Sequence, residues 1–372
     1  MDATKRDVEL LMHVFAKMAE IEIYDLGFTS PRCKAASATV TKCLVDAILG
    51  MSSPINLKRL RLKMGYQRDM DSVRLVNALN KIEILEVQLK EEDASLLFKV
   101  MMHMESSVTS LSLLGNLSLS RLEPEPLFHV FDKLKVFGAR CYNLPLEAGL
   151  VKTLFEKIAS GTNLKKLRID GCPNLSQVSP DLLRNMVAQL EELELKELDG
   201  DHTIPYLFRN NETVKIVTAI ATTETSNLKK LNICTDMRSV DYRLLSKMTT
   251  KVEDLTLEYA VENLKTIFQI SISNWPGKLR RLKVIGRSTN LDTLDADILA
   301  RVANNLECFE FSRHSFLTVN QTENILSLAL KTKSNLKRLH VWVQGCSSNL
   351  DLLVREAEKI IPELNIHYKS GF

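Results

Sequence analysis

The sequence has no long apolar run, little glycine and none of the short motifs that mark common enzymes. Glycine accounts for 13 of 372 residues. There is no G-x-x-x-x-G-K or G-x-G-x-x-G phosphate loop, no H-E-x-x-H and no G-x-S-x-G. No apolar run approaches the roughly 18 residues that a membrane-spanning helix needs. These absences indicate a protein that is not an enzyme, with no cofactor and no membrane partner.

Histidine and cysteine are scattered along the chain and form no clusters. None of the 7 histidines has the close spacing of a zinc site, and the 7 cysteines include no C-x-x-C pair. An odd number of dispersed cysteines favours free thiols in a reducing compartment. Cys172, Cys234 and Cys308 are interpreted as packing residues and not as nucleophiles. We expect no metal site and a cytoplasmic protein, with the nucleus as the alternative.

An excess of one charge is also missing. The chain has 49 basic and 46 acidic residues, which gives a net charge of +3. Such a balance creates no strong field toward a polyanion, so we expect no nucleic-acid partner. Apolar residues make up 45% and charged residues 26%, as in an ordinary folded domain.

The chain is organised around a segment that recurs. Residues 164–175 read LKKLRIDGCPNL, in which Leu164, Leu167 and Ile169 give the spacing L-x-x-L-x-L. Alternation from Leu167 to Ile169 predicts a short strand with one buried face. The same template predicts thirteen strands, whose first apolar positions are Met18, Leu57, Ile82, Val108, Leu134, Leu164, Leu190, Leu228, Val252, Leu279, Leu306, Leu336 and Ile361. Successive positions are 24 to 30 residues apart, except for gaps of 39 and 38 that indicate insertions.

Apolar pairs with helical spacing precede these strands. Leu183 and Met186 stand seven and four residues before Leu190, and other repeats have the same arrangement. Each pair lies on one face of a helix that we expect to pack against the sheet. Each repeat is therefore predicted to be a strand, a turn and a helix.

Segment 164–175 is similar to leucine-rich repeats, of the ribonuclease-inhibitor-like and the cysteine-containing F-box types, although no F-box is recognisable. The resemblance implies an α/β solenoid shaped like a horseshoe, with a curved parallel sheet of about 13 strands on the concave side and helices on the convex side. We expect one domain over residues 5–368, with helix 5–17 as a half repeat and an insertion loop at about 199–211.

Charged residues between the apolar strand positions alternate in sign from one repeat to the next. The basic sets are Lys58, Arg59 and Arg61; Lys165, Lys166 and Arg168; Lys229 and Lys230; Arg280, Arg281 and Lys283; and Lys337 and Arg338. The acidic sets are Glu83 and Glu86; Glu191, Glu192 and Glu194; Glu253 and Asp254; Glu307 and Glu310; and Glu363. Two interpretations are open: a charged groove for a polar partner, or lateral pairing of neighbouring strands that specifies register.

Aromatic and arginine side chains at strand ends and in the insertion are the predicted partner contacts, since such residues anchor protein interfaces. The candidates are Tyr206, Phe208, Arg209, Tyr259, Arg287, Arg313, His340, Trp342 and Tyr368. The alternative for each ring is packing over its neighbours at the rim of the sheet.

The resemblance implies a protein-protein interaction scaffold that is monomeric on its own, with a substrate-recognition component of an SCF-type ubiquitin ligase as the leading context. The alternatives are a regulator of a small GTPase, an enzyme inhibitor, and a fragment of an innate-immune ligand sensor.

Overall fold

The computed structural model describes most of the chain, with gaps. The described residues are 18–24, 58–63, 82–88, 91–103, 106–114, 123–140, 148–170, 174–196, 210–234, 240–258, 264, 268, 277–285, 289–312, 315–332 and 334–369. The chain groups into two compact units, unit 1 (residues 1–177) and unit 2 (residues 178–372). The single domain expected over residues 5–368 stays a prediction.

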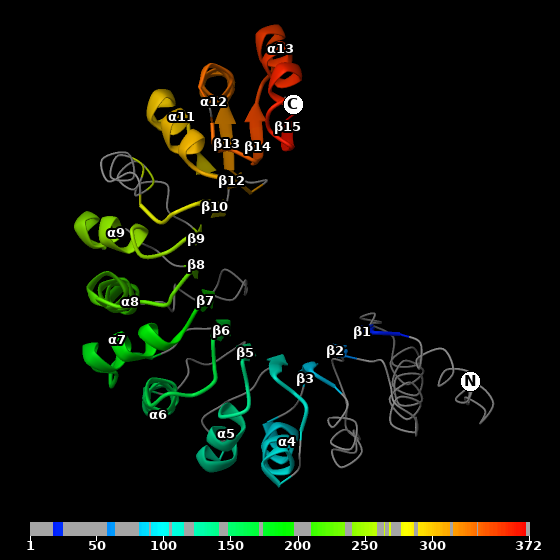
Figure 1. The fold of residues 1–372 in the computed structure, drawn as a ribbon, viewed down its shortest axis with the longest axis vertical. Helices are drawn as coiled ribbons and strands as arrows, with labels where there is room; N and C mark the ends of the chain where they lie inside the picture. The colour runs from blue at the N-terminus through cyan, green and yellow to red at the C-terminus, as the bar shows by residue number, and fades with distance from the viewer. Residues whose placement is uncertain are drawn as a thin grey trace, which may run out of the picture. The chain divides into compact units, whose positions relative to one another are not determined.

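Unit 1 is a parallel sheet with helices on one face (Figure 1). Its described strands are β1 (Glu20–Tyr24), β2 (Arg59–Lys63), β3 (Ile84–Gln88), β4 (Ser110–Leu114), β5 (Val136–Arg140) and β6 (Lys166–Asp170). Its described helices are α4 (Glu91–His103), α5 (Pro124–Phe131) and α6 (Ala148–Ala159). Each strand pairs in parallel with the next one in the chain.

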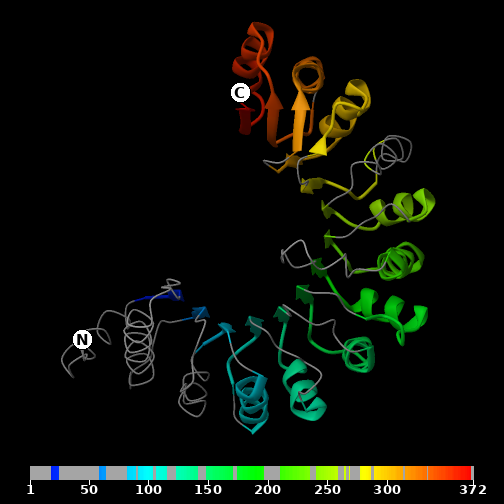
Figure 2. The ribbon, with the colours of Figure 1, turned by 180° about the vertical axis from the view of Figure 1, so that it is seen from behind.

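Unit 2 repeats this arrangement, again with the helices on one side of the strands (Figures 1 and 2). Its described strands are β7 (Glu192–Lys196), β8 (Lys230–Cys234), β9 (Asp254–Glu258), β10 (Arg281–Ile285), β11 (Thr289–Asn290), β12 (Cys308–Phe311), β13 (Ser315–Thr318), β14 (Arg338–Gln344) and β15 (Glu363–Lys369). Its described helices are α7 (Pro180–Gln189), α8 (Asn210–Thr222), α9 (Tyr242–Thr249), α11 (Ala296–Asn305), α12 (Val319–Lys331) and α13 (Ser348–Ala357). The main parallel order is β7-β8-β9-β10-β12-β14-β15.

The predicted strands are confirmed, each beginning two residues after its first apolar position. Thus β6 follows Leu164, β8 follows Leu228 and β14 follows Leu336. Two short strands, β11 and β13, were not predicted. They form because β14 is seven residues long: its first half pairs with β12 and its second half with β13, which in turn pairs with β11.

Apolar side chains of adjacent strands stack in register beneath the helices. Leu231, Leu255, Leu282 and Phe309 are Cα partners in sequence across β8, β9, β10 and β12, and each is 0% exposed. Helix residues seven and four positions before the first apolar position of a repeat, such as Leu183 and Met186 before Leu190, are buried as predicted. The core is thus a continuous layer within each unit, to which every repeat contributes the same positions.

Met18 differs from the other first apolar positions. It is 42% exposed, whereas Leu164 and Leu228 are 0% and 1% exposed. Its strand, β1, pairs only with β2 in the described sheet. A side chain at such an edge lacks the neighbouring repeat that covers its counterparts.

Strand starts share two hydrogen-bond patterns. One backbone carbonyl accepts two successive N–H groups of the next strand, as when Lys229 O accepts from Glu253 N at 2.8 Å and Asp254 N at 2.9 Å. A hydroxyl two residues before the first apolar position then accepts that residue's N–H, at Ser106, Thr162, Ser226 and Ser334. These turns position each strand beside its predecessor.

Side-chain caps begin the helices of unit 2 directly after the loops. Ser179 Oγ accepts from Leu182 N at 3.2 Å, with Pro180 at the first helical position of α7. Ser347 Oγ accepts from Leu350 N at 2.9 Å at the start of α13. At α12, Thr318 and Gln321 form a capping box. These caps satisfy N–H groups that a helix start leaves unpaired, and so they fix where each strand-to-helix connection ends.

Some predicted features lie outside the described residues. These are the half-repeat helix over residues 5–17 and residues 199–209 of the insertion loop, whereas residues 210 and 211 begin α8. Within the described part of the chain, no helix has both the length and the apolar character needed to traverse a bilayer.

We predict that Leu231→Asp unfolds unit 2 cooperatively, because it places an unpaired carboxylate at a position that is 0% exposed. The expected loss in the free energy of unfolding is about 4 kcal/mol or more, measured by urea denaturation followed by circular dichroism. Leu352→Asp on α13, where Leu352 is 61% exposed, is the matched control and should change stability little. Equal stability of the two variants would contradict the assignment of the inward face.

Candidate functional site

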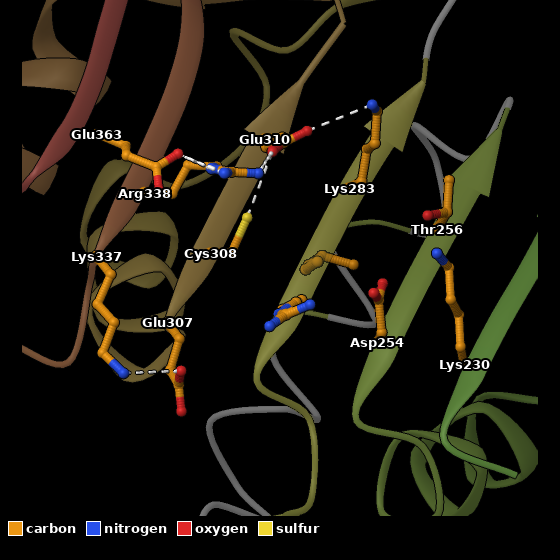
Figure 3. Close-up of a pocket in the computed structure, with 12 residues that line it drawn as sticks. Lys230, Asp254, Thr256, Lys283, Glu307, Cys308, Glu310, Lys337, Arg338 and Glu363 are labelled. Atoms are coloured by element: carbon orange, nitrogen blue, oxygen red, sulfur yellow. Dashed lines mark hydrogen bonds and ion pairs between the residues drawn. The ribbon is translucent and has the colours of Figure 1, made fainter. Parts of the chain in front are cut away.

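The sheet face that carries no helices, here called the open face, is polar and holds a shallow hollow in unit 2 (Figure 3). The hollow has a volume of about 400 Å³. It is lined by Lys230, Asp254, Thr256, Arg281, Leu282, Lys283, Glu307, Cys308, Glu310, Lys337, Arg338 and Glu363. Strand alternation explains this composition, because the residues between the buried leucines and phenylalanines point to the opposite face.

Arginine and carboxylate side chains cross-link neighbouring strands over the hollow. Arg338 on β14 donates from Nε to Glu363 Oε2 on β15 at 2.5 Å, and from Nη1 to Glu310 Oε1 on β12 at 3.4 Å. Lys283 on β10 lies 3.3 Å from the other oxygen of Glu310. Four strands are thereby joined by one chain of ion pairs (Figure 3).

Glu307 forms a second set of ion pairs, with residues that directly precede the neighbouring strands. It accepts hydrogen bonds from Lys337 Nζ and Arg280 Nη1, both at 3.0 Å. Both hydrogen bonds lower the pKa of the Glu307 carboxyl below its ordinary 4.5, and the one from Lys337 has the larger effect. The negative charge of Glu307 is therefore the favoured state at neutral pH.

Burial acts on the less exposed groups of the hollow. It raises the pKa of Asp254, against the opposing influence of Lys230 and Arg281. For Glu310, burial also opposes ionisation, but Lys283, Cys308 and Arg338 outweigh it and lower the pKa. Cys308 is half-buried on the open face, so it packs at the surface of the sheet and not in the apolar layer.

Unit 1 has its own charge pairing. Arg61 on β2 donates to Glu86 Oε2 on β3 at 2.5 Å and pairs with Glu22 on β1 on its other side. Arg59 likewise lies 3.6 Å from Glu20 and 3.5 Å from Glu86. Lateral pairing of neighbouring strands, one of the two interpretations of the alternating charges, is thus present in both units. Each such pair contributes about 0.2–1 kcal/mol.

A cluster of three rings, His340, Trp342 and His367, lies on the open face of β14 and β15. Trp342 and His367 are Cα partners and stack with ring centroids 4.4 Å apart and an interplanar angle of 20°. The rings of His340 and His367 are 4.8 Å apart. The pKa of His340 is lowered from 6.5, mainly by burial and to a smaller extent by the nearby His367. The uncharged form of His340 is therefore favoured at neutral pH. We call these three residues the aromatic cluster.

Of the predicted contact residues, the structure brings His340 and Trp342 together. Tyr368 lies on the opposite, helix-bearing face, where its hydroxyl is 3.1 Å from Asp351 Oδ1 of α13. The remaining candidates lie outside the described residues: Tyr206, Phe208, Arg209, Tyr259, Arg287 and Arg313.

His367 was missed in the sequence, although a signal was present. Trp342 and His367 each stand six residues after the first apolar position of their repeats, Leu336 and Ile361. Parallel strands in register place equal offsets side by side. Among the described residues, no group of three or more His, Cys, Asp or Glu side chains has a geometry that could hold a metal ion.

We predict that the pKa of Glu307 lies below 4.5 and that Lys337→Gln raises it toward that value, because the variant removes the main hydrogen bond. Since the folded pKa is depressed, the stability that this carboxylate contributes is present above about pH 4.5 and is lost as the pH falls through the folded pKa. Carboxyl-resolved NMR titration measures the midpoint. Lys331→Gln, on α12, is the control; a midpoint shifted equally by both variants would contradict the pairing.

Comparison with known proteins gives remote likenesses only. No protein-family model matches the chain, and no curated protein sequence matches it. The crystal structure of the leucine-rich repeat-containing protein LegL7 from Legionella pneumophila is 15% identical, covers 93% of this chain and 99% of its own, and has a TM-score of 0.48. A chain of the yeast Rad7 and Elc1 complex is 16% identical, covers 98% of this chain and 81% of its own, and has a TM-score of 0.46. The repeated strand-helix units of the structure itself give the fold class, an α/β leucine-rich-repeat architecture.

Proposed function

We propose that the chain is a non-catalytic scaffold that binds another protein through the open face of unit 2. The observation that carries the proposal is the aromatic cluster, which stands on two seven-residue strands beside the polar hollow. Protein interfaces combine such an aromatic anchor with a polar, charged surround.

The geometry of the aromatic cluster favours binding at low entropic cost. Trp342 is stacked on His367 and its Nε1 is buried without a hydrogen-bond partner in the described part of the protein. The stacking on His367 favours one orientation of the indole before any partner binds, so less side-chain freedom is lost on association. The neutral imidazole of His340 adds a further uncharged ring to the same surface.

The ion pairs of the open face determine what kind of partner fits. Two of the four carboxylates of the hollow, Glu307 and Glu310, are already shared between two cations each. Such a surface gives no long-range attraction to a polyanion and suits local pairing with single side chains of a folded or extended protein segment.

The wider context that we propose is substrate recognition for an SCF-type ubiquitin ligase, in the cytoplasm. It rests on the similarity of segment 164–175 to the cysteine-containing repeats of that class. Tyr206, Phe208 and Arg209 in the insertion, together with Tyr259, Arg287 and Arg313, stay candidate contacts in this proposal.

We predict that Trp342→Ala weakens binding of the partner by about tenfold or more, as expected for a central aromatic anchor, without lowering the melting temperature. Tyr368→Phe is the control: it removes a hydroxyl on the helix-bearing face and should leave binding unchanged. The measurement is affinity capture with quantitative mass spectrometry, paired with differential scanning fluorimetry. A parallel loss of binding and of melting temperature in Trp342→Ala would indicate that the ring serves packing alone.

The ligase context makes a separate prediction about which proteins are captured. Cullin-adaptor components should be enriched with both the unmodified chain and Trp342→Ala, whereas the substrate protein should be depleted with Trp342→Ala. Recovery of small GTPases in their place would contradict this context and favour regulation of a GTPase.

A further inference from the structure

One register row of the unit 2 open face alternates in charge with a single exception. The row is Glu192, Lys230, Asp254, Arg281, Cys308, Arg338 and Glu363, each the Cα partner of the next. Acidic and basic residues alternate at every position except one. The exception is Cys308, which lies between Arg281 and Arg338. An acidic residue at this position would continue the alternation.

We propose that a carboxylate of the partner protein, from an Asp or Glu side chain, binds over Cys308 against Arg281 and completes the row. This inference rests on the proposed function, since it names the chemistry of the partner at the same surface. The site is the part of the hollow between β10 and β14.

The two arginines beside Cys308 differ in what they already bind. Arg338 is engaged by Glu363 at 2.5 Å and by Glu310 at 3.4 Å. Arg281 is exposed, and its guanidinium makes no hydrogen bond or close ion pair in the part of the chain that the structure describes, although its charge acts on Asp254. A guanidinium in this condition can receive a carboxylate through two parallel hydrogen bonds.

Cys308 leaves the position without charge. Burial, followed by the charge of Glu310, raises the pKa of the Cys308 thiol to about 12, so the thiol stays protonated at neutral pH. Its Sγ lies 3.5 Å from Glu310 Oε1, toward which it donates (Figure 3). The small side chain also leaves room above it, because it is one of the residues that line the hollow.

The charges around the hollow are unbalanced by one. The lining contains five cationic side chains, Lys230, Arg281, Lys283, Lys337 and Arg338, and four carboxylates, Asp254, Glu307, Glu310 and Glu363. One incoming carboxylate makes the two sets equal. Repulsion from the carboxylates already present is reduced because Glu307 and Glu310 are each shared by two cations.

The neighbouring aromatic cluster favours a peptide segment over a small free anion. His340 follows Arg338 by two residues on β14, which is about 7 Å along a strand. An acidic residue at Cys308 would thus be followed, within one extended segment, by a side chain in reach of the rings. The expected partner segment has an acidic residue and a nearby apolar or aromatic residue.

The test measures binding of fluorescein-labelled hexaglutamate by anisotropy at low salt, with hexaglutamine as the neutral comparison. Cys308→Asp supplies the missing carboxylate from within the chain, and Cys308→Ser is its neutral match. Arg281→Gln removes the receiving guanidinium, and Arg301→Gln removes an equal charge from α11. Circular dichroism and melting curves show that each variant is folded.

We expect Arg281→Gln to weaken hexaglutamate binding by about three- to fivefold, and Cys308→Asp by about tenfold, since it both occupies Arg281 and repels the peptide. Cys308→Ser and Arg301→Gln should change it less than about twofold. Equal binding by Cys308→Asp and Cys308→Ser, or equal effects of Arg281→Gln and Arg301→Gln, would overturn the inference. Failure of these contrasts while Trp342→Ala still loses the captured partner would leave the proposed function standing. Loss of that Trp342 effect would remove the proposed function itself.

Discussion

The register of adjacent parallel strands is the constraint on which the rest of the structure depends. Because Leu231, Leu255 and Leu282 are Cα partners, their side chains fill one continuous apolar layer that no single repeat could bury by itself. A shift of one residue in any strand would exchange its buried and open faces. Every polar feature of the open face is therefore positioned by burial on the other side of the same strands.

The open face shows what this register permits. Strand residues that are not buried lie in rows across the sheet, and charges of opposite sign within a row pair between neighbouring strands, as Arg61 does with Glu86 and Arg338 with Glu363. Pairing keeps an exposed sheet polar and discourages incorrect alignments. Two departures from this charge pairing, the neutral Cys308 and the rings around Trp342, lie in the C-terminal strands of unit 2.

Much of this fold follows from the sequence because its determinants are local. A first apolar residue such as Leu164 predicts the strand that starts two residues later, and pairs such as Leu183 and Met186 predict the helix face that packs on the sheet. The hydroxyl turns at Ser226 and Ser334 were equally local, and a search for Ser or Thr two residues before each strand template would have found them.

The site was less predictable because it depends on neighbours distant in sequence. The stacking of His367 on Trp342 requires the length and pairing of β14 and β15, and alternation had to continue past the five-residue template to place Tyr368 on the helix-bearing face. Strands β11 and β13 were not predicted for a similar reason. Strand β13 forms by pairing with the second half of β14, and β11 forms by pairing with β13. The position of Cys308 between Arg281 and Arg338 was not predicted either, because these three residues lie on strands that are distant in sequence.

The central claim is that a partner protein contacts the open face of unit 2, and site-specific photocrosslinking tests it most directly. A benzophenone amino acid would replace Asn365, which is exposed beside His340 on the open face, in one protein and Leu352, which is 61% exposed on α13, in another. The account predicts that the partner crosslinks through position 365 and not through position 352. Crosslinking through position 352 alone would contradict it and would assign binding to the helix-bearing side.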